Sequence, residues 1–378
     1  MWKNLLSKKR YYSPTEIEAD NNEEYYRSSF HKDYDRLIFS NSFRRLSKKT
    51  QVHPLSKNDH VHNRLTHSLE VASVGRSLGL RAGKFLKKNK DESINPYDIA
   101  YIVQTACLAH DIGNPPFGHA GEEVIKEWFK KNEDKDFLKP LTPKEKDDFQ
   151  HIDGNAQSFR IVSQTENNLF AGGMNLTFAT LGTLVKYPYS SSKCEENKKS
   201  KFNYFQSEEE FFKLLFTELG LVTQTATFKR HPLSYLMEAS DDICYGLLDL
   251  QDAFELQIIT LNDMKPIFNY LCSEEKTKNT YTDQKYTDLQ KVSKLVAISI
   301  NNLAVHTMKV FEDNFDSIIS DVQPEDLIKR FSDQNMIEGM KEAKKLGRDK
   351  IFNDRRKVEL ELGAYNIIEI LLDNLIRA

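Results

Sequence analysis

The chain has 378 residues with 53 Lys and Arg against 56 Asp and Glu, and this near-neutral sum argues against a general binder of polyanions. Charged residues make up 29%, and only 15 Gly and 11 Pro are present, which favours helices over strands and loops. No apolar run approaches the ~18 residues that span a membrane, and the first residues lack the apolar core of a signal peptide. The 4 cysteines form no CxxC pair, so we expect a reducing, cytoplasmic compartment and neither a disulfide scaffold nor a zinc ribbon.

In chain order, the pattern predicts a mostly helical protein. Apolar residues recur at helical intervals over 66–88, and a second helix is expected over 99–111, with Asp98 as its cap. The other expected segments are a polar arm over 1–30, an amphipathic segment over 34–47, a short extended stretch over 50–54, a charge-rich excursion over 130–150, a helix over 153–164, irregular or short β structure over 169–205, helices from 208 to the end, and a solvated loop over 273–285.

The densest chemistry lies in the stretch AHDIGNPPFGHAGE. Its first histidine, His110, falls about three helical turns after the start of its helix, so it should share that helix's buried face. Gly113 and the Pro115-Pro116 pair end the helix, which leaves Asp111 beside His110. An adjacent imidazole and carboxylate can bind one metal ion, which would take further ligands from other helices.

Two other predicted helices carry polar side chains that can complete such a site. His67 lies on the apolar face of the first long helix, and Asp241 shares a narrow stripe with Tyr245 and Asp249. Burying carboxylates is costly unless a cation compensates their charge, and imidazoles with carboxylates suit Mn²⁺, Fe²⁺, Zn²⁺ or Mg²⁺ alike. Spacing alone leaves open whether Asp241 or Asp242 is the ligand, and whether His67 is instead a hydrogen-bonded core histidine.

At the level of motifs, the chain resembles the dGTP triphosphohydrolases of the HD-domain metal-dependent phosphohydrolase superfamily. The motifs that carry this resemblance are DYDRLIFSNSFRRLSKKTQV, NRLTHSLEV, CLAHDIGNPPFGHAGE, DGNAQSFRI, NLTFATLGTLVKYP and RHPLSYLMEASDDICYGLLDLQD. The resemblance implies an all-α fold, an HD-domain helical bundle with small β elements and a helical C-terminal region. It implies a single unit over 1–378, with a core over about 30–255 and the C-terminal region over about 256–378.

The resemblance also implies the roles of the site residues. It places the metal ligands at His67, His110, Asp111 and Asp241, with Mn²⁺ or Mg²⁺ as the expected ion and Fe²⁺, Zn²⁺ or Co²⁺ as alternatives. It places the catalytic pair at His119 and Glu122, which lie three residues apart and can share a helix face. The residues implied to contact the substrate are Gln51, Arg64, Lys186, Tyr187, Lys201, Tyr245 and Asp249. Among these, Tyr245 is expected to leave no room for a 2′-hydroxyl, and Asp249 to bind the 3′-hydroxyl.

The implied reaction is hydrolysis of dGTP, and of other dNTPs in some family members, at the α-phosphate to the deoxynucleoside and tripolyphosphate. A homo-oligomer, with a hexamer favoured, and a dNTP or single-stranded DNA effector are implied as well, and Arg355 and Arg356 are candidates to reach a neighbouring subunit's site. Two alternatives remain open. One is an HD-type nucleotide phosphodiesterase or phosphatase, and the other is a nucleotide- or ssDNA-binding regulatory module, which the basic tract Lys198-Lys199-Ser200-Lys201 would support.

Overall fold

The computed structural model describes residues 1–378 apart from 14, 20–25, 167–171, 195–200, 321–324 and 377–378. Within the described part, helices dominate, and the sheet there is a single antiparallel pair, β1 (Lys9–Ser13) with β2 (Glu16–Ala19). The expected all-α fold with small β elements is therefore confirmed. No helix in the described ranges has the length and apolar character needed to cross a membrane.

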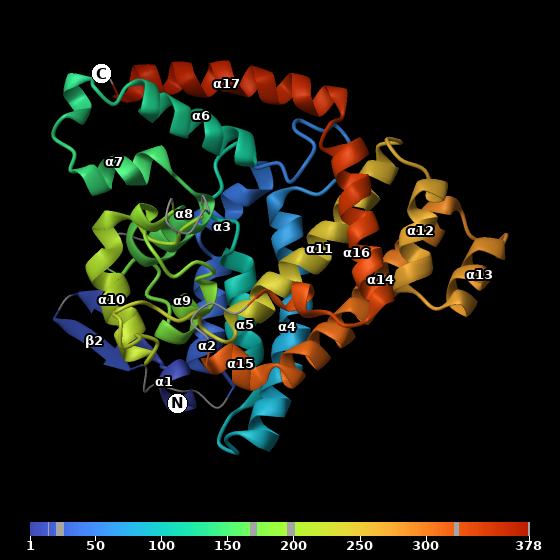
Figure 1. Cartoon of the computed structure of the whole chain (residues 1–378), viewed down its shortest axis with the longest axis horizontal. Coiled ribbons are helices and arrows are strands. Elements are labelled where there is room, and N and C mark those ends of the chain that lie inside the picture. Colours follow the sequence, from blue (N-terminus) through green and yellow to red (C-terminus); the bar gives the residue numbers. More distant parts are fainter. Residues whose placement is uncertain (14, 20–25, 167–171, 195–200, 321–324, 377–378) are drawn as a thin grey trace.

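The longest described helices are α4 (Arg64–Asn89), α11 (Ser234–Glu255), α14 (Asp288–Asp313) and α17 (Arg355–Ile376) (Figure 1). The helices of the first half are α1 (Trp2–Leu5), α2 (Ser29–Ile38), α3 (Asn41–Arg45), α4 (Arg64–Asn89), α5 (Pro96–Ala109), α6 (Gly118–Lys131), α7 (Pro143–Gln150), α8 (Gly154–Arg160) and α9 (Phe178–Leu184). Those of the second half are α10 (Glu209–Glu218), α11 (Ser234–Glu255), α12 (Leu261–Leu271), α13 (Glu274–Thr282), α14 (Asp288–Asp313), α15 (Phe315–Ser320), α16 (Gln334–Leu346) and α17 (Arg355–Ile376). Short 3₁₀ turns lie at Leu46–Lys48, Asp136–Leu138, Ser191–Lys193, Gln206–Glu208 and Leu327–Arg330, and π turns at Ile161–Thr165 and Gly347–Ile351.

The centre of the fold is the hairpin of α4 and α5, which lie side by side (Figure 1). Their backbones approach closely because glycines recur along α4 at helical spacing. A Cβ placed on Gly79 would lie 2.9 Å from Cα of Ala100, and one on Gly83 would lie 2.6 Å from Cα of Pro96. Because the two helices run in opposite directions, the start of α4, with His67, lies beside the end of α5, with His110.

Helix α5 begins at Pro96, earlier than the predicted start at Ile99, and the prediction that Asp98 is its N-cap is wrong. Asn95 is the N-cap, and its side chain accepts a hydrogen bond from the Tyr97 N–H at 3.1 Å. Pro96 occupies the first helical position, where its missing N–H costs nothing and its fixed φ suits a helix. Asp98 therefore lies inside the first turn, where a carboxylate still interacts favourably with the helix dipole.

Two other segments differ from expectation. The predicted loop over 273–285 contains α13, whose composition is polar although Thr277 and Thr280 are buried. The segment over 169–205, predicted to be irregular or short β, contains α9 as well as an isolated bridge between Ser190 and Tyr204. All residues of α9 are buried, so an alternation of polar and apolar residues could not mark it as a helix.

His62 fastens the segment before α4 to α11 and to α4 itself. Its Nδ1 lies 2.6 Å from Oδ1 of Asp252, and its Nε2 lies 2.9 Å from Oε2 of Glu70. Burial lowers the pKa of His62, but hydrogen bonds to the two carboxylates and their charges outweigh this and raise it to about 10. The imidazolium is thus stabilised in the folded state.

This ion triad should make stability depend on pH. Because the folded pKa of His62 lies above the unfolded value of about 6.5, its contribution is fully present below pH ~6.5 and is lost as the pH rises toward 10. Urea unfolding across that range should show a fall in the free energy of unfolding that is smaller in His62→Gln. The exposed neighbour His60 is the control, and a His60→Gln variant should keep the wild-type slope.

The glycine packing of α4 also makes a direct prediction. Gly83→Ala should lower the free energy of unfolding by about 1–3 kcal/mol, because the added methyl group meets the backbone of Pro96. Gly363→Ala in α17, where a Cβ would meet nothing within 4 Å, should instead be neutral or stabilise by up to ~1 kcal/mol. Equal effects of the two substitutions in thermal or urea unfolding would show that the helix pair is not held at this close distance.

Candidate functional site

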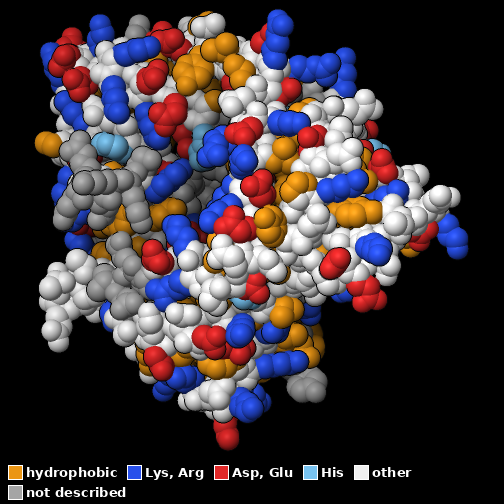
Figure 2. Space-filling view, turned by 45° about the vertical axis from the view of Figure 1, so that its right-hand side comes forward, with side chains coloured by type: hydrophobic (Ala, Val, Ile, Leu, Met, Phe, Trp, Pro, Cys, Tyr) orange, Lys and Arg blue, Asp and Glu red, His pale blue; other side chains and the backbone are white. Residues whose placement is uncertain are grey.

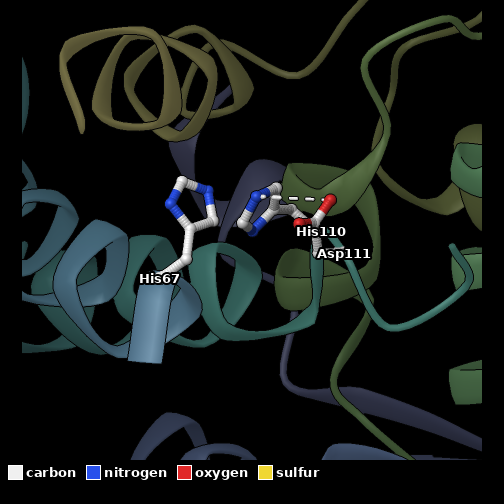
Figure 3. A group of neighbouring side chains, drawn as sticks. All are labelled: His67, His110 and Asp111. Atoms are coloured by element: carbon white, nitrogen blue, oxygen red, sulfur yellow. Dashed lines mark ion pairs between the residues drawn. The ribbon is translucent and has the colours of Figure 1, made fainter. Parts of the chain in front are cut away.

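Three of the predicted ligands meet where α4 and α5 come together. His67, His110 and Asp111 each offer one ligand atom, these atoms lie within 4.8 Å of one another, and all three side chains are buried. The two imidazole rings are tilted by 58° with centroids 5.5 Å apart. Figure 3 shows Asp111 on the far side of His110 from His67, so the three groups form a row along one side of the site.

Asp241 of α11 joins this group. Its Oδ1 lies 3.3 Å from Nε2 of His67 and 3.4 Å from Nε2 of His110. The Nδ1 of His110 lies 2.6 Å from the carbonyl oxygen of Cys107. In the neutral tautomer in which Nδ1 carries the proton and donates it to that oxygen, Nε2 has a lone pair that faces the cluster. Two imidazole nitrogens and two carboxylates at one point fit a divalent metal ion.

Basic residues keep both carboxylates of the cluster ionised. Burial raises the pKa of Asp111, but opposing charges, of which that of Arg64 is the largest, outweigh it and lower that pKa well below its ordinary value. Burial acts in the same way on Asp241, where the ammonium group of Lys186, 3.1 Å from Oδ2, is the largest opposing charge and the pKa is again lowered. Arg64 is hydrogen-bonded to Asp111 directly.

The cluster lies in a cavity of about 450 Å³. The face drawn in Figure 2 is hollowed near its centre, with Lys and Arg side chains gathered around the hollow. Most of the predicted site residues line the cavity, namely Gln51, Arg64, His67, His110, Asp111, His119, Lys186, Tyr187, Lys201, Asp241 and Tyr245. Glu122 and Asp249 do not line it, and both side chains are buried.

The His119–Glu122 pair lies at the start of α6. Nδ1 of His119 is 2.9 Å from Oε2 of Glu122, and Oε1 of Glu122 accepts a hydrogen bond from the Gly154 N–H at 2.8 Å. Burial raises the pKa of Glu122, but the hydrogen bond to His119 and the charge of Lys201 outweigh it, so its pKa is lowered. The His119 side chain is 81% exposed, so an ionised, buried carboxylate holds an imidazole that can reach a ligand.

The turn before α6 fixes this pair relative to the cluster. Phe117, at φ 64°, and Gly118, at φ 56°, are two successive residues in the left-handed region. Phe117 adopts that conformation at a cost that the surrounding packing must offset. A Cβ on Gly118 would lie 2.8 Å from Nη2 of Arg64, so a larger residue would displace the end of that side chain, and the positive φ of Gly118 also favours glycine.

Lys186, Tyr187 and Lys201, which are predicted to contact phosphate, are held in position by polar contacts. The amide oxygen of Asn203 accepts hydrogen bonds from the N–H groups of Lys186 at 3.0 Å and Tyr187 at 2.7 Å. Lys201 pairs with Asp153 at 3.0 Å and lies 3.8 Å from Oε2 of Glu122. The rest of the basic tract, residues 198–200, lies outside the described residues.

Tyr245 and Asp249 follow Asp241 on α11 at one and two turns. Tyr245 is 38% exposed and faces the cavity, with its ring nearly parallel to that of Phe352. Asp249 is buried, and within the described structure its Oδ2 has no hydrogen-bond partner. Burial, followed by the charge of Asp252, raises the pKa of Asp249 well above its ordinary value.

Several cavity residues were not predicted. Asn114, whose side-chain N–H donates to Oδ1 of Asp111 at 2.5 Å, lies within the HD stretch and could have been found by its position. Phe352, Lys357 and Glu361 also line the cavity, although the sequence pointed instead to Arg355 and Arg356 in this segment. The Arg355 side chain is 89% exposed and pairs with Glu359, and a reach toward a neighbouring subunit stays a prediction for both arginines.

Comparison with known proteins shows which family the chain resembles. A family model described as "HD domain" matches residues 64–153. A deoxyguanosinetriphosphate triphosphohydrolase-like protein of Pseudomonas aeruginosa is 43% identical over 377 residues, covering 98% of this chain and 84% of the relative. One from Synechocystis is 35% identical over 98% of this chain and 84% of the relative. A deoxyguanosinetriphosphate triphosphohydrolase of Klebsiella pneumoniae is 31% identical over 97% of this chain and 79% of the relative.

The donor set predicts that a divalent ion binds and stabilises the folded chain. Adding Mn²⁺ to chelator-treated protein should raise the melting temperature, since an ion at 100 times its Kd adds about 2.7 kcal/mol. Asp241→Asn should weaken this shift and His110→Ala should abolish it, with the exposed His60→Ala as control. Calorimetric titration of Mn²⁺ into each variant would reveal a site elsewhere if the His110→Ala protein still bound the ion with wild-type affinity.

Proposed function

The chain belongs to the deoxyguanosinetriphosphate triphosphohydrolase-like family of HD-domain proteins, and from that premise we propose that it hydrolyses dGTP to deoxyguanosine and tripolyphosphate. The observation that carries this proposal is one cavity that combines the cluster of His67, His110, Asp111 and Asp241 with basic side chains beside it and the His119 imidazole. A triphosphate needs several positive charges, and a poor leaving group needs a proton. Both requirements can be met inside this cavity.

The roles of the residues follow from their positions. His67, His110, Asp111 and Asp241 would hold a divalent ion, which when bound would polarise the α-phosphate and activate water. Arg64 already reaches that cluster through Asp111 and is placed to pair with phosphate oxygens near it. Lys186 and Lys201 lie in the same wall, where charge-assisted hydrogen bonds to the remaining phosphates would fix the triphosphate.

The chemical step needs one proton at the leaving oxygen. Water adds its oxygen to the α-phosphorus, and the bond from that phosphorus to the 5′-oxygen breaks. His119, in its protonated form, can give a proton from Nε2 to the departing 5′-oxygen, because Nδ1 is held by Glu122. The buried, ionised Glu122 stabilises that imidazolium, and the proton of the attacking water later restores it.

Sugar selection is proposed to depend on α11. Tyr245, one turn beyond Asp241, is placed so that its ring would close on C2′ of a sugar whose phosphate lies at the cluster. Asp249 would bind the 3′-hydroxyl, and in this structure its carboxyl is buried and does not line the cavity. Its raised pKa favours a neutral carboxyl that can donate as well as accept.

We also propose a homo-oligomer, with a hexamer favoured, in the cytoplasm, with a dNTP or single-stranded DNA as effector. The outer surface of α17 supports an assembly because Leu362, Ile367, Ile370 and Leu371 are 52–63% exposed. Apolar side chains gathered on one helix commonly mark a protein interface. Light scattering after gel filtration would measure the assembly, and a monomer would contradict it.

Identifying the phosphorus product tests the proposed reaction. With Mn²⁺ and dGTP, ³¹P NMR should show tripolyphosphate, and GTP in parallel should give little. Orthophosphate or pyrophosphate would instead support the phosphatase alternative. That alternative uses the metal cluster but assigns no role to the basic side chains of Arg64, Lys186 and Lys201. Salt-sensitive binding of ssDNA without turnover of any dNTP would support a regulatory module.

The His119–Glu122 pair predicts the kinetic signature of an acid catalyst. His119→Ala and Glu122→Gln should each lower kcat for dGTP by about 10²–10⁴-fold, since proton transfer contributes effects of that size, while Mn²⁺ binding is retained. The matched control is Glu123→Gln, because Glu123 is the next residue of α6, is exposed and pairs with Lys126 and not with His119. A loss of activity in Glu123→Gln as large as that in Glu122→Gln would contradict a specific role for the pair.

A further inference from the structure

Asp153 is a buried acidic residue to which the proposed reaction assigns no role. It stands directly before α8 and is the N-cap of that helix. Its Oδ1 accepts a hydrogen bond from the Asn155 N–H at 2.8 Å, which satisfies one of the free N–H groups at the helix start. Asparagine and serine cap helices about as well as aspartate does. The cap alone therefore gives no reason for a buried charge at this position.

The other oxygen of this carboxylate faces Lys201. Nζ of Lys201 lies 3.0 Å from Oδ2 of Asp153 and 3.8 Å from Oε2 of Glu122, so one ammonium group is within ion-pair distance of two buried carboxylates. Burial lowers the pKa of Lys201, but the charge of Asp153, followed by that of Glu122, outweighs it and raises that pKa. Asp153 is thus the closer and the stronger of the two partners, and Lys201 stays charged.

The start of α8 is fixed relative to the catalytic pair and to the metal cluster. The N–H of Gly154 donates to Oε1 of Glu122 at 2.8 Å, and a Cβ on Gly154 would lie only 2.9 Å from that oxygen. One turn further along α8, the hydroxyl of Ser158 donates to the carbonyl oxygen of His110 at 3.0 Å and accepts from the Gly113 N–H at 2.9 Å. A side chain at the N-cap of α8 therefore has a set position relative to both.

An ion pair with a fixed carboxylate prepares the lysine for a ligand. Lys201 lines the cavity, and its long side chain is 30% exposed. Fixing a flexible lysine costs conformational entropy, and an ion pair that exists before the ligand binds removes that cost from binding. Burying a carboxylate is also costly, and a neutral side chain would avoid that cost. Holding Lys201 in advance accounts for the charge at Asp153.

We propose that Asp153 is a positioning residue, which holds the ammonium group of Lys201 beside Glu122 so that it meets the phosphates of a bound triphosphate. The inference rests on the function proposed above. Asp153 itself touches no substrate, and it acts through Lys201.

Variants of Asp153 test this role by the kinetic parameter that they change. Asp153→Asn keeps the cap of α8 and removes the charge, so KM for dGTP should rise by about 3–30-fold. The value of kcat should stay nearly unchanged, because a phosphate contact made equally before and during the reaction supports binding alone. Asp153→Ser, a second uncharged cap, should give the same pattern. A fall in kcat at unchanged KM would show that Asp153 acts through the contact of Gly154 with Glu122, and would overturn the proposal.

A double variant tests whether Asp153 acts through Lys201. Lys201→Met should raise KM for dGTP by about 10–100-fold, and Asp153→Asn in that background should change KM by less than about twofold. Asp333→Asn is the matched control, because Asp333 is the exposed N-cap of α16 and accepts from the Asn335 N–H at 2.9 Å. It should leave both parameters at their wild-type values. A wild-type KM in Lys201→Met, or two effects that multiply in the double variant, would contradict the proposal.

Binding of inorganic tripolyphosphate separates this inference from the proposed reaction. Calorimetry with the metal-free chain should show weaker binding to Asp153→Asn and to Lys201→Met than to wild type, and no further loss in the double variant, even if wild type hydrolyses no dNTP. In that case the reaction would be wrong and the positioning role would stand. Wild-type affinity for tripolyphosphate in Asp153→Asn, or no binding to the wild-type protein, would overturn the role.

Discussion

The close antiparallel contact of α4 with α5 is the constraint on which the site depends. Glycines on α4 allow the two backbones to touch, and the helix directions then place His67 at the start of one helix beside His110 at the end of the other. Neither histidine lies in an irregular loop, so the positions of their nitrogens are set by helix packing, which is far stiffer than a loop. Asp241 joins them because α11 packs on the same pair of helices.

At this centre, the negative charges of the buried carboxylates are balanced by ion pairs with basic side chains and not by solvent. The carboxylates of Asp111 and Asp241 stay ionised because Arg64 and Lys186 contact them. The same two basic residues line the cavity, so a triphosphate would meet positive charge next to the cluster. A buried group of this kind would be too costly without its partners, which is why changes at any one member should affect the others.

Much of the site followed from the sequence because its residues lie in compact motifs with strong helical signals. The end of the helix at Gly113 and the proline pair predicts that His110 and Asp111 lie side by side, and the structure groups them with His67. The family resemblance favours Asp241 over Asp242 as a further ligand, which stays a prediction. The residues that the C-terminal part of the chain contributes to the cavity could not be found in this way. Lys357 and Glu361 have the i, i+4 spacing of an ordinary surface pair, and only the docking of α17 on α6 brings them to the cavity. The segments α9 and α13 were missed for related reasons, since one is buried on all sides and the other is polar.

The most direct measurement is a crystal structure of the protein with Mn²⁺ and a dGTP analogue that resists cleavage between the α-phosphorus and the 5′-oxygen. Anomalous scattering should place Mn²⁺ within coordination distance of His67, His110, Asp111 and Asp241, with the α-phosphate beside it. His119 should then point Nε2 at the 5′-position. An ion bound elsewhere, or a γ-phosphate at the cluster with the 5′-position far from His119, would contradict hydrolysis at the α-phosphate by this site.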